Sequence, residues 1–365
     1  MEIRTLGEIC NIVSGGTPSR SKAEFWNKGT IPWIKIGDIK GKYVNESEEF
    51  ITQKGIDGSS AKLLTKGTVL YTIFATLGEV SVLGIDACTN QAIAGIVIKD
   101  VSKLDTYYLY YYLKSKKAYV NSVGRGVAQN NINMSILRGF EVPLPGLFKQ
   151  KEIVDILDKV SRIIDNREQE LQKLDDLIKA RFVEMFGDPV ANSKGLQTKD
   201  LKDVLILKAG DFTAASDISN KPSKTNIYPC YGGNGIRGYV SEYNQEGEYS
   251  LVGRQGALSG NVQLARGKFR NTEHALLVTP MIEMNSIWLN QLLYNLDLKR
   301  YQTGAAQPGL SVKNLQEIQI LMVPINEQNI FADFVHQVDK SKVAVQKALE
   351  ETQVLFDSLM QQYFG

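Results

Sequence analysis

The sequence predicts an α+β protein built from two domains of the same mixed α/β architecture, joined by two long helices that form an antiparallel coiled coil with a pseudo-two-fold axis. Three observations lead to this prediction. Part of the chain repeats after 178 residues, each repeat contains a long helical stretch with a heptad stripe, and each helical stretch follows a segment of short apolar runs. The predicted boundaries are 1–148 for the first domain, 149–187 for the first helix, 188–324 for the second domain and 325–365 for the second helix.

The internal repeat relates residues 119–187 to residues 297–365. Both copies contain a loop rich in glycine and amide side chains, then a short strand ending in proline, then a long helical stretch that ends in an aromatic residue and a glycine. The matched residues include Gly126 with Gly304, Gln129 with Gln307, Gln150 with Gln328, Asp155 with Asp333, and Phe186-Gly187 with Phe364-Gly365. A repeat of this kind indicates that one structural unit occurs twice in the chain.

Each helical stretch carries a heptad stripe, in which the steps between mostly apolar positions alternate between four and three. The first stripe consists of Ile153, Leu157, Val160, Ile164, Arg167, Leu171, Leu174, Ile178, Arg181 and Met185. The second consists of Phe331, Val335, Val338, Lys342, Val345, Leu349, Thr352, Phe356, Leu359 and Tyr363. Such a stripe can also pack a helix against its own domain, but two stripes of matched spacing favour pairing with each other. An antiparallel pair of about 38 residues per helix, roughly 57 Å long, would place the two domains at its opposite ends.

The segments before the helices consist of short β-branched and aromatic runs, such as Thr68 to Phe74 and Ile93 to Ile98, punctuated by Gly, Asn and Pro. Each segment closes with an amphipathic helix, over Thr106 to Val120 and over Ser286 to Leu298. We therefore expect two α+β domains with one architecture and different surfaces. This organisation suits one task performed on two stretches of a linear polymer, and roughly 57 Å corresponds to about 17 base pairs of DNA.

The composition excludes several classes of protein. A content of 43% hydrophobic and 22% charged residues is typical of a globular chain, and without a twenty-residue apolar stretch or a signal pattern we expect a cytoplasmic protein with no membrane partner. Cys10, Cys88 and Cys230 are far apart and the chain has two histidines, so we expect no disulfide framework and no metal site. The net charge of +2 is a mild bias, with the excess of Lys and Arg in the two domain segments.

Motifs for catalysis are weak or missing. The sequence has no G-x4-G-K-[ST] string, which would bind ATP phosphates, and no Asn-Pro-Pro-aromatic string of the kind found in amino-methyltransferases. Gly233 to Gly238 fits G-x-G-x-x-G, but strand residues rather than a helix follow it, so we interpret it as a turn. Asp38-Ile39-Lys40 alone is insufficient for a nuclease site, and we interpret His274, next to Glu273, as structural or base-contacting. We therefore expect no catalytic residue and no bound cofactor.

The opening of the first domain resembles a known family. Its strings are Ile12-Val13-Ser14-Gly15-Gly16-Thr17-Pro18-Ser19-Arg20, Phe25-Trp26 and Ile31-Pro32-Trp33-Ile34-Lys35-Ile36-Gly37-Asp38-Ile39. Together with Thr89-Asn90-Gln91-Ala92-Ile93, Thr272-Glu273-His274-Ala275 and the proline- and glutamine-containing entries to the two helices, they resemble target-recognition domains of type I restriction specificity subunits. The resemblance covers essentially the whole chain. The second domain departs from it, because Lys208-Ala209-Gly210-Asp211-Phe212-Thr213 stands where Ser-Gly-Gly-Thr-Pro is expected.

The resemblance implies a subunit that chooses the DNA sequence and performs no chemistry itself. Each recognition domain would read one half of a split site in double-stranded DNA, and the coiled coil would set the gap between the halves. Two modification subunits would dock on the chain and methylate adenine with S-adenosylmethionine. Restriction subunits, where present, would use ATP and Mg²⁺ for translocation and cleavage.

Candidate DNA contacts follow from side-chain type, because Arg and Lys suit guanine edges, Asn and Gln suit adenine edges, and hydroxyl and backbone N–H groups suit phosphates. In the first domain they are Ser14, Gly15, Gly16, Thr17, Ser19, Arg20, Lys35, Asn90, Gln91, Arg125, Gln129, Asn130, Asn131 and Asn133. In the second domain they are Asn234, Arg237, Arg254, Gln255, Arg266, Lys268, Arg270 and His274. The alternative for each is a solvated surface residue or an amide that stabilises a turn.

Two other functions stay open at this point. The chain could be a nuclease or methyltransferase fused to its own specificity domains, and methyl transfer by the purified chain alone would reveal this. It could instead be a coiled-coil scaffold that binds only protein, in which case the partnered chain would bind no DNA.

Overall fold

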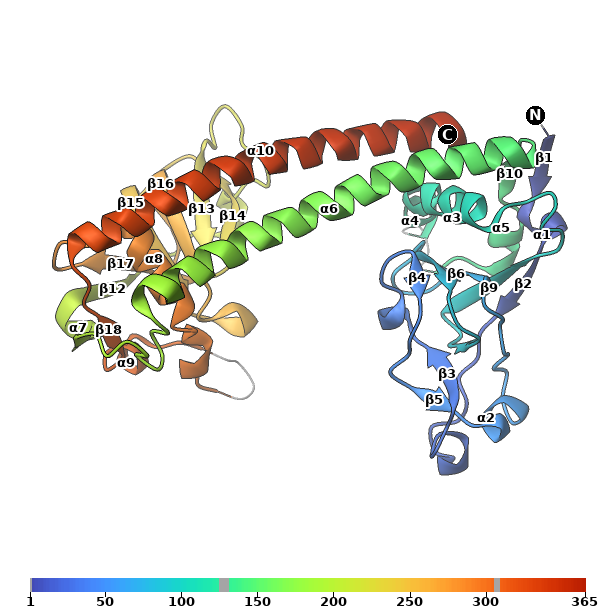
Figure 1. The fold of residues 1–365 in the computed structure, drawn as a ribbon, viewed down its shortest axis with the longest axis horizontal. Helices are drawn as coiled ribbons and strands as arrows, with labels where there is room; N and C mark the ends of the chain where they lie inside the picture. Colours follow the sequence, from blue (N-terminus) through green and yellow to red (C-terminus); the bar gives the residue numbers. More distant parts are fainter. Residues whose placement is uncertain (1, 125–130, 305–308) are drawn as a thin grey trace. The chain divides into compact units, whose positions relative to one another are not determined.

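The computed structural model describes residues 2–124, 131–304 and 309–365 (Figure 1). The chain divides into two compact units, one formed by Met1–Asn166 with Leu349–Gly365 and the other by Arg167–Ala348. Two long helices, α6 (Leu147–Phe186) and α10 (Ile325–Phe364), each contribute to both units. Each unit therefore contains one of the two predicted domains together with part of both helices.

In the first unit, the main sheet has the strand order β2-β9-β6-β7-β4, formed by Cys10–Ser14, Ile93–Ile98, Val69–Thr72, Val80–Leu83 and Tyr43–Val44. Neighbouring strands are antiparallel, except that β4 runs parallel to β7. A smaller sheet has the order β5-β3-β8, formed by Phe50–Ile51, Ile31–Ile34 and Cys88–Thr89, with β3 parallel to β8. Beside the start of α6, β1 (Glu2–Thr5) pairs antiparallel with β10 (Glu141–Leu144).

The first unit contains five short helices. They are α1 (Leu6–Ile9), α2 (Gln53–Asp57), α3 (Thr106–Ser115), α4 (Lys117–Gly124) and α5 (Met134–Arg138), with short 3-10 turns at Ala23–Phe25 and Ile36–Asp38. Of these helices, α3 packs between the main sheet and α6, and α2 lies beside the 3-10 turn Ala23–Phe25 (Figure 1). The carboxylate of Asp105 caps α3 by accepting the N–H of Tyr107 at 2.8 Å. Residues 108–113 of α3 are all buried, because the sheet covers one side of the helix and α6 and α10 cover the other (Figure 1).

In the second unit, the main sheet has the order β12-β17-β15-β16-β13-β14, formed by Leu205–Ala209, Ala275–Pro280, Gln245–Gly253, Val262–Asn271, Tyr228–Gly232 and Gly235–Val240. Here β13 runs parallel to β16 and the other neighbours are antiparallel. A separate pair joins β11 (Thr198–Asp200) to β18 (Gln319–Leu321). The helices are α7 (Leu201–Val204), α8 (Ser286–Asn295) and α9 (Val312–Leu315), with 3-10 turns at Ala215–Asp217, Gly256–Leu258 and Leu298–Tyr301.

The two units share one topology. The order β2-β9-β6-β7 of the first corresponds to β12-β17-β15-β16 of the second, with antiparallel pairing throughout. The parallel pairs β3–β8 and β13–β16 also correspond, as do the antiparallel pairs β1–β10 and β11–β18. The prediction of two α+β domains with one architecture is therefore confirmed.

The helices α6 and α10 pack together through the predicted heptad stripes. In the first unit, the start of α6 shares a core with the end of α10, through Ile153, Leu157, Val160, Phe356 and Leu359. In the second unit, the end of α6 shares a core with the start of α10, through Leu174, Ile178, Phe331, Val335 and Val338. Start therefore meets end in both units, which confirms the antiparallel sense. One polar position of the stripe, Lys342, places its Nζ 2.5 Å from Asp175 Oδ1.

A buried glutamine in the first turn of α6 fixes this helix to α3. Gln150 is fully buried, and its side-chain oxygen accepts the N–H of Asp105 at 2.8 Å. Its amide nitrogen donates to the carbonyl oxygens of Lys103 at 2.7 Å and Pro145 at 2.8 Å. One side chain thus satisfies three backbone groups at the point where α3 and α6 begin.

The second unit repeats this arrangement at the start of α10. Gln328, the residue that matches Gln150 in the sequence repeat, accepts the N–H of Asn285 at 2.8 Å and donates to Val323 O at 2.8 Å. Asn285 caps α8 as Asp105 caps α3. The repeated glutamine is therefore a structural element that joins each domain to its long helix.

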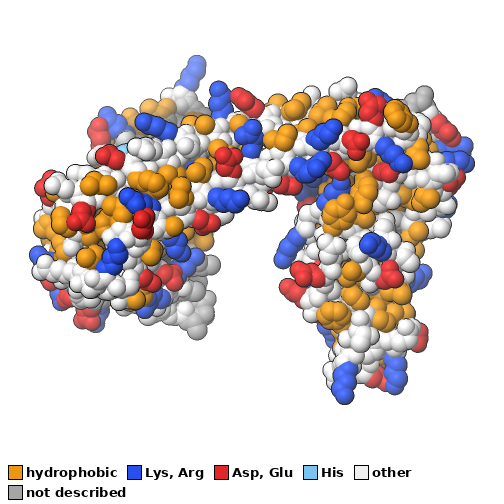
Figure 2. All heavy atoms as spheres, viewed as in Figure 1, with side chains coloured by type: hydrophobic (Ala, Val, Ile, Leu, Met, Phe, Trp, Pro, Cys, Tyr) orange, Lys and Arg blue, Asp and Glu red, His pale blue; other side chains and the backbone are white. Residues whose placement is uncertain are grey.

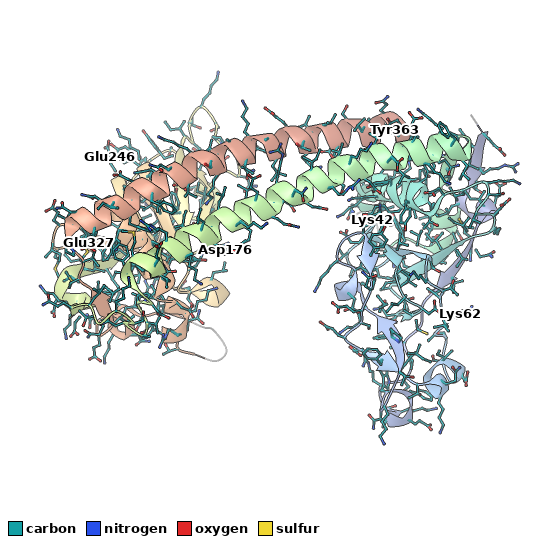
Figure 3. All side chains as sticks on the ribbon, viewed as in Figure 1. Lys42, Lys62, Asp176, Glu246, Glu327 and Tyr363 are labelled. Carbon is teal, nitrogen blue, oxygen red and sulfur yellow. The ribbon has the colours of Figure 1, made fainter. Side chains whose placement is uncertain are left out.

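A charged contact under α6 adds a second fixed point in the first unit (Figure 3). Lys42 Nζ lies 2.5 Å from Asp158 Oδ1, and the hydroxyl of Tyr111 donates to the same oxygen. The Lys42 ammonium also lies 4.5 Å from the centroid of the Tyr107 ring. Burial, followed by this bond to Asp158, raises the pKa of Tyr111 far above its ordinary value, so the phenol stays protonated and keeps donating.

Some elements differ in detail from the sequence prediction. The helix expected over Thr106 to Val120 is divided into α3 and α4 at Lys116, and the helix expected over Ser286 to Leu298 ends at Asn295. The predicted turn in the G-x-G-x-x-G string is the tip of the hairpin β13–β14. Among the residues that the structure describes, no helix has both the length and the apolar character needed to cross a membrane.

The buried glutamine yields a stability prediction. Replacing Gln150 by Met keeps the volume but leaves the Asp105 N–H and two carbonyl oxygens without partners, so we expect the free energy of unfolding to fall by about 2–4 kcal/mol. Urea unfolding followed by circular dichroism measures the change. The matched control is Gln172→Met, because Gln172 lies on the same helix, is exposed and bonds only at 3.3 Å to Asp176. Equal losses in the two variants would contradict this role for Gln150.

Candidate nucleic-acid interface

The first unit contains a crossing of two loops at the edge of its main sheet. The loop after β2 crosses the loop between β8 and β9, and the N–H groups of Gly15 and Gly16 donate to Ile93 O at 3.0 Å and to Thr89 O at 2.8 Å. A Cβ atom on Gly15 would lie 2.1 Å from Asn90 O, which is too close for any other residue. The glycines are therefore required for this close approach of two backbones.

The same crossing occurs in the second unit, although its sequence differs. The N–H of Gly210, at the end of β12, donates to Ala275 O at 3.2 Å, and the N–H of Asp211 donates to Asn271 O at 3.1 Å. A Cβ atom on Gly210 would lie 2.2 Å from Asn271 O. Gly210 therefore takes the place of Gly15, and the missing Ser-Gly-Gly-Thr-Pro string does not remove the crossing.

The side chains over the two crossings differ in chemistry. In the first unit the hydroxyl of Thr17 donates to the side-chain oxygen of Gln91, and both residues are exposed. In the second unit the N–H of Thr213 donates to the carboxylate of Glu273 at 3.2 Å. One backbone scaffold thus presents a hydroxyl and an amide in one unit and a carboxylate in the other.

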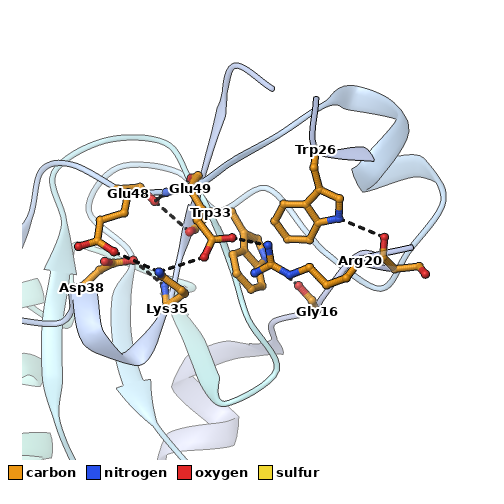
Figure 4. Close-up of polar contacts among 10 residues, drawn as sticks. Gly16, Arg20, Trp26, Trp33, Lys35, Asp38, Glu48 and Glu49 are labelled. Carbon is orange, nitrogen blue, oxygen red and sulfur yellow. Dashed lines mark hydrogen bonds and ion pairs between the residues drawn. The ribbon is translucent and has the colours of Figure 1, made fainter. Parts of the chain in front are cut away.

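Two tryptophans hold the loop beyond the first crossing (Figure 4). The indole N–H of Trp33 donates to Gly16 O at 2.9 Å, and that of Trp26 donates to Ser19 O at 3.1 Å. The two rings meet edge to face with their centroids 5.1 Å apart. The Arg20 guanidinium carbon lies 3.7 Å from the centroid of the Trp26 ring, which is a cation–π contact.

Arg20 and Lys35, both predicted DNA contacts, share one carboxylate. Glu49 Oε2 lies 2.5 Å from Arg20 Nη1, and Glu49 Oε1 lies 3.0 Å from Lys35 Nζ. Lys35 also pairs with Glu48 at 3.1 Å. Hydrogen bonds from Arg20 and then from Lys35 hold the pKa of Glu49 below its ordinary value, and the bonds to Glu49 and Glu48 raise the pKa of Lys35.

His274 is held from both sides in the second unit. Its Nδ1 lies 2.8 Å from Gln255 Oε1, and its Nε2 lies 3.0 Å from Glu273 Oε1. Arg270 donates from Nε to the Thr213 hydroxyl at 3.3 Å. The loop after β15, the end of β16 and the loop after β16 therefore bring Gln255, Arg270 and His274, respectively, to the second crossing. His274 is thus bonded through both ring nitrogens, and its structural or base-contacting role stays a prediction.

Two predicted contacts of the second unit lie apart from this group. Arg266 and Lys268 lie along β16 and face Glu248 and Glu246 of β15, at 2.5 Å and 3.8 Å. Glu248 also accepts a hydrogen bond from the hydroxyl of Ser286, at the start of α8. Arg266 therefore lies near α8 rather than near the crossing.

The other predicted contacts have mixed positions. Asn133 caps α5 by accepting the Ile136 N–H at 2.9 Å, and Asn234, at the β13–β14 turn, accepts from Asn261 at 3.0 Å. Asn131 forms a β-bridge with Phe74, and Arg237 is exposed on β14.

The remaining candidates lie close to the crossings or outside the described residues. Ser14 is exposed, and Asn90 orders its own loop by accepting the Ala92 N–H. The Arg254 N–H donates to His274 O. Arg125, Gln129 and Asn130 lie outside the described residues. Contact of any of these residues with DNA stays a prediction.

Reasoning from the sequence missed the residues that hold this surface in place. Trp26, Trp33 and Glu49 organise the first loop, while Thr213, Glu273 and Asn261 organise the second. The tryptophans were visible in the sequence only as part of a familiar string. Glu49 gave no local signal, because its partners are 14 and 29 residues away.

The described residues offer little for metal binding or for thiol chemistry. Within residues 2–124, 131–304 and 309–365, no group of three or more His, Cys, Asp and Glu side chains is placed to hold a metal ion. The three cysteines are buried free thiols, and burial raises the pKa of Cys10 to about 12 and that of Cys88 to about 11. The Asp38 carboxylate accepts the Lys35 N–H at 2.8 Å, so its place in the D-x-K string is that of a local cap.

Comparisons with known proteins agree on one family. The model for the type I restriction modification DNA specificity domain matches residues 1–176 and again 193–353. The specificity subunit of the type I restriction enzyme EcoprrI from Escherichia coli is 32% identical over 349 residues, covering 92% of this chain and 86% of that protein. The MjaIX specificity subunit from Methanocaldococcus jannaschii is 28% identical over 235 residues, 61% of this chain and 54% of that protein.

A solved structure shows the same fold. The type I restriction–modification S subunit from Mycoplasma genitalium superimposes with a TM-score of 0.58 at 18% identity, covering 100% of this chain and 96% of that one. At this identity the likeness concerns the fold alone.

The glycine at each crossing yields a second prediction. Gly15→Ala and Gly210→Ala would each push a Cβ into a backbone oxygen, so we expect each to lower the free energy of unfolding by about 1–3 kcal/mol and to displace its loop. Gly37→Ala is the control, because a Cβ there meets nothing within 4 Å. Thermal unfolding measures the difference, and a Gly15→Ala variant as stable as Gly37→Ala would contradict the crossing.

Proposed function

Because the chain belongs to the family of type I restriction–modification DNA specificity subunits, we propose that each of its two recognition domains reads one half of a split DNA site. The observation that carries this proposal is the repeated loop crossing. Gly15 and Gly210 bring the same two backbones together in both units, whereas the side chains above them differ. A common scaffold with different polar groups suits the recognition of two different short sequences.

The chemistry around each crossing fits base edges and phosphates. In the first domain Gln91 offers an amide for adenine, Arg20 offers a guanidinium for guanine, and the exposed hydroxyls of Ser14, Thr17 and Ser19 suit phosphates. The amides of Gly15 and Gly16 already bond within the chain, so the hydroxyls are the better phosphate partners in this loop. In the second domain Gln255, Arg270 and His274 offer the corresponding groups.

The long helices are the part of the chain that suits a constant spacing between the half-sites. Both run without interruption through 40 residues, and both belong to the cores of both units. We propose that they also dock two modification subunits, which supply adenine methylation with S-adenosylmethionine, and that restriction subunits, where present, supply ATP- and Mg²⁺-dependent cleavage. The chain itself would hold no cofactor and act in the cytoplasm.

The charge distribution supports a role in selection rather than in bulk binding of DNA. On the face shown in Figure 2, Lys and Arg side chains alternate with Asp and Glu side chains, without an extended area of one sign among the side chains drawn. The net charge of the whole chain is +2. Because non-specific affinity comes mainly from phosphate neutralisation, such a surface gives little of it.

The direct test is single-molecule sequencing of adenine methylation in the genome of the source organism, with and without this gene. We expect a split motif that is methylated only when the gene is present, and its two halves would identify what each domain reads. A protein-only scaffold would leave the methylome unchanged and would bind no DNA with its partners. Methyl transfer by the purified chain alone would instead show that the chain is an enzyme.

A change of helix length tests the proposed spacing. Deleting four residues from the middle of α6 shortens that helix by about 6 Å and shifts its heptad phase, so we expect the preferred gap between the half-sites to change or methylation to be lost. A better matched variant removes seven facing residues from each helix, which keeps the phase and shortens the pair by about 10 Å, or roughly three base pairs. An unchanged gap between the half-sites in the second variant would disprove the proposal that the two helices set this spacing.

A further inference from the structure

One carboxylate of the first recognition domain, that of Glu49, joins two cations that lie near the loop crossing. Glu49 stands just before β5, and its two oxygens divide between Arg20 at 2.5 Å and Lys35 at 3.0 Å. Arg20 lies in the loop after β2, and Lys35 lies between β3 and the 3-10 turn Ile36–Asp38, so the two cations belong to separate segments. Glu49 thus connects them at the side of the loop crossing (Figure 4).

The guanidinium of Arg20 is fixed by more than this ion pair. Its carbon lies 3.7 Å from the Trp26 ring centroid and 5.1 Å from that of Trp33, and both indoles are anchored to the backbone of the same loop. A guanidinium has five N–H donors, and Glu49 accepts from one of its nitrogens. With 55% of its side chain exposed, Arg20 keeps donors directed to solvent in a set orientation.

The electrostatics of this group oppose simple attraction to phosphate. Hydrogen bonds from Arg20 and Lys35 keep the pKa of Glu49 low, so the carboxylate is charged at neutral pH. Glu48 pairs with Lys35 from the other side. Asp38 also accepts the backbone N–H of Lys35 at 2.8 Å. Arg20 and Lys35 therefore stand against Glu48, Glu49 and Asp38, two positive charges against three negative ones, and a passing phosphate meets a cluster without excess positive charge.

We propose that Glu49 is a specificity-determining residue of the first recognition domain, which orients Arg20 and Lys35 for base contacts while cancelling their attraction for phosphates. This inference rests on the proposed function, in which this domain reads DNA. Cations that are neutralised off target add little to non-specific binding, because that binding depends on free Lys and Arg. A fixed guanidinium still makes the paired hydrogen bonds that a guanine edge accepts. The preference for the correct DNA sequence rises, because a wrong sequence forms no base contact with Arg20 that would offset its repulsion by the Glu49 carboxylate.

The test compares Glu49→Gln with the wild-type full chain, bound to its modification subunits, on two duplexes. One duplex has random sequence and the other carries the split motif found from the methylome. We expect Glu49→Gln to bind the random duplex about tenfold more tightly near 0.1 M salt, because Arg20 loses its ion pair and Lys35 keeps only the one to Glu48. The slope of log affinity against log salt should steepen by about one to two, and the preference for the motif should fall by a similar factor.

A matched control separates position from charge. Glu24→Gln also removes one acidic charge and one ion pair, to Lys54 at 3.2 Å, in the same part of the domain. We expect its affinities to stay within about twofold of wild type, since distant exposed charges are screened. Glu49→Asp, which keeps the charge, should retain most of the discrimination.

Several outcomes would overturn the inference. An unchanged salt slope in Glu49→Gln, or an equal loss of affinity for both duplexes, would show that Glu49 only supports the fold. If Glu49→Gln does not fold, Arg20→Gln decides: we expect it to weaken binding to the motif at least tenfold more than binding to the random duplex, and equal weakening would make Arg20 a plain phosphate contact. If the wild-type complex binds neither duplex, the proposed function fails with it. If the wild type binds and Glu49→Gln behaves identically, only this inference fails.

Discussion

The apolar pairing of α6 with α10 is the constraint on which the rest of the structure depends. Each unit closes its core with side chains from both helices, so neither domain is complete without a segment that lies far away in the sequence. Phe364, at the end of the chain, packs against Tyr108 of α3 at 5.2 Å between ring centroids. Its counterpart in the repeat, Phe186, packs against Trp288 of α8 at 6.1 Å. The core of each domain therefore includes side chains of both long helices.

A second constraint separates what both domains share from what distinguishes them. Backbone contacts such as those of Gly15 and Gly210, and buried groups such as Gln150 and Gln328, recur because they build the fold. The side chains over the crossings differ instead: Gln91 is exposed and accepts from the Thr17 hydroxyl, whereas Glu273 is half-buried and accepts the Thr213 N–H. A duplicated scaffold can therefore change what it recognises without losing stability, provided that the substitutions stay outside the crossing and the core.

The sequence predicted the elements whose signal is periodic. The heptad steps from Ile153 and Phe331 identified both helices and their partners, because one buried stripe leaves a regular trace in the sequence. The match of Gln150 with Gln328 was visible, but its three backbone partners were not, since they depend on how α3 meets α6. Asn133 shows the limit of side-chain type: its contact with DNA stays a prediction, while the structure shows that it caps the short helix that it precedes, where an Asn is typical.

The individual site residues were harder to predict because sheets bring distant segments together. Arg20 lies in the loop after β2 and Glu49 lies just before β5, and no spacing in the sequence announces their pairing. Arg266 and Lys268 were candidates by side-chain type, but Glu248 pairs with Arg266 and also accepts from Ser286 at the start of α8. Counting cations along a sequence therefore overestimates the positive charge that DNA would meet.

The linkage of two recognition domains through shared helices compensates for a weak attraction of each domain to DNA. Binding of one domain to its half-site raises the effective concentration of the other domain at the second half-site. Selectivity in such a design depends on both halves fitting at once, which a surface strongly attracted to phosphate at every sequence would obscure.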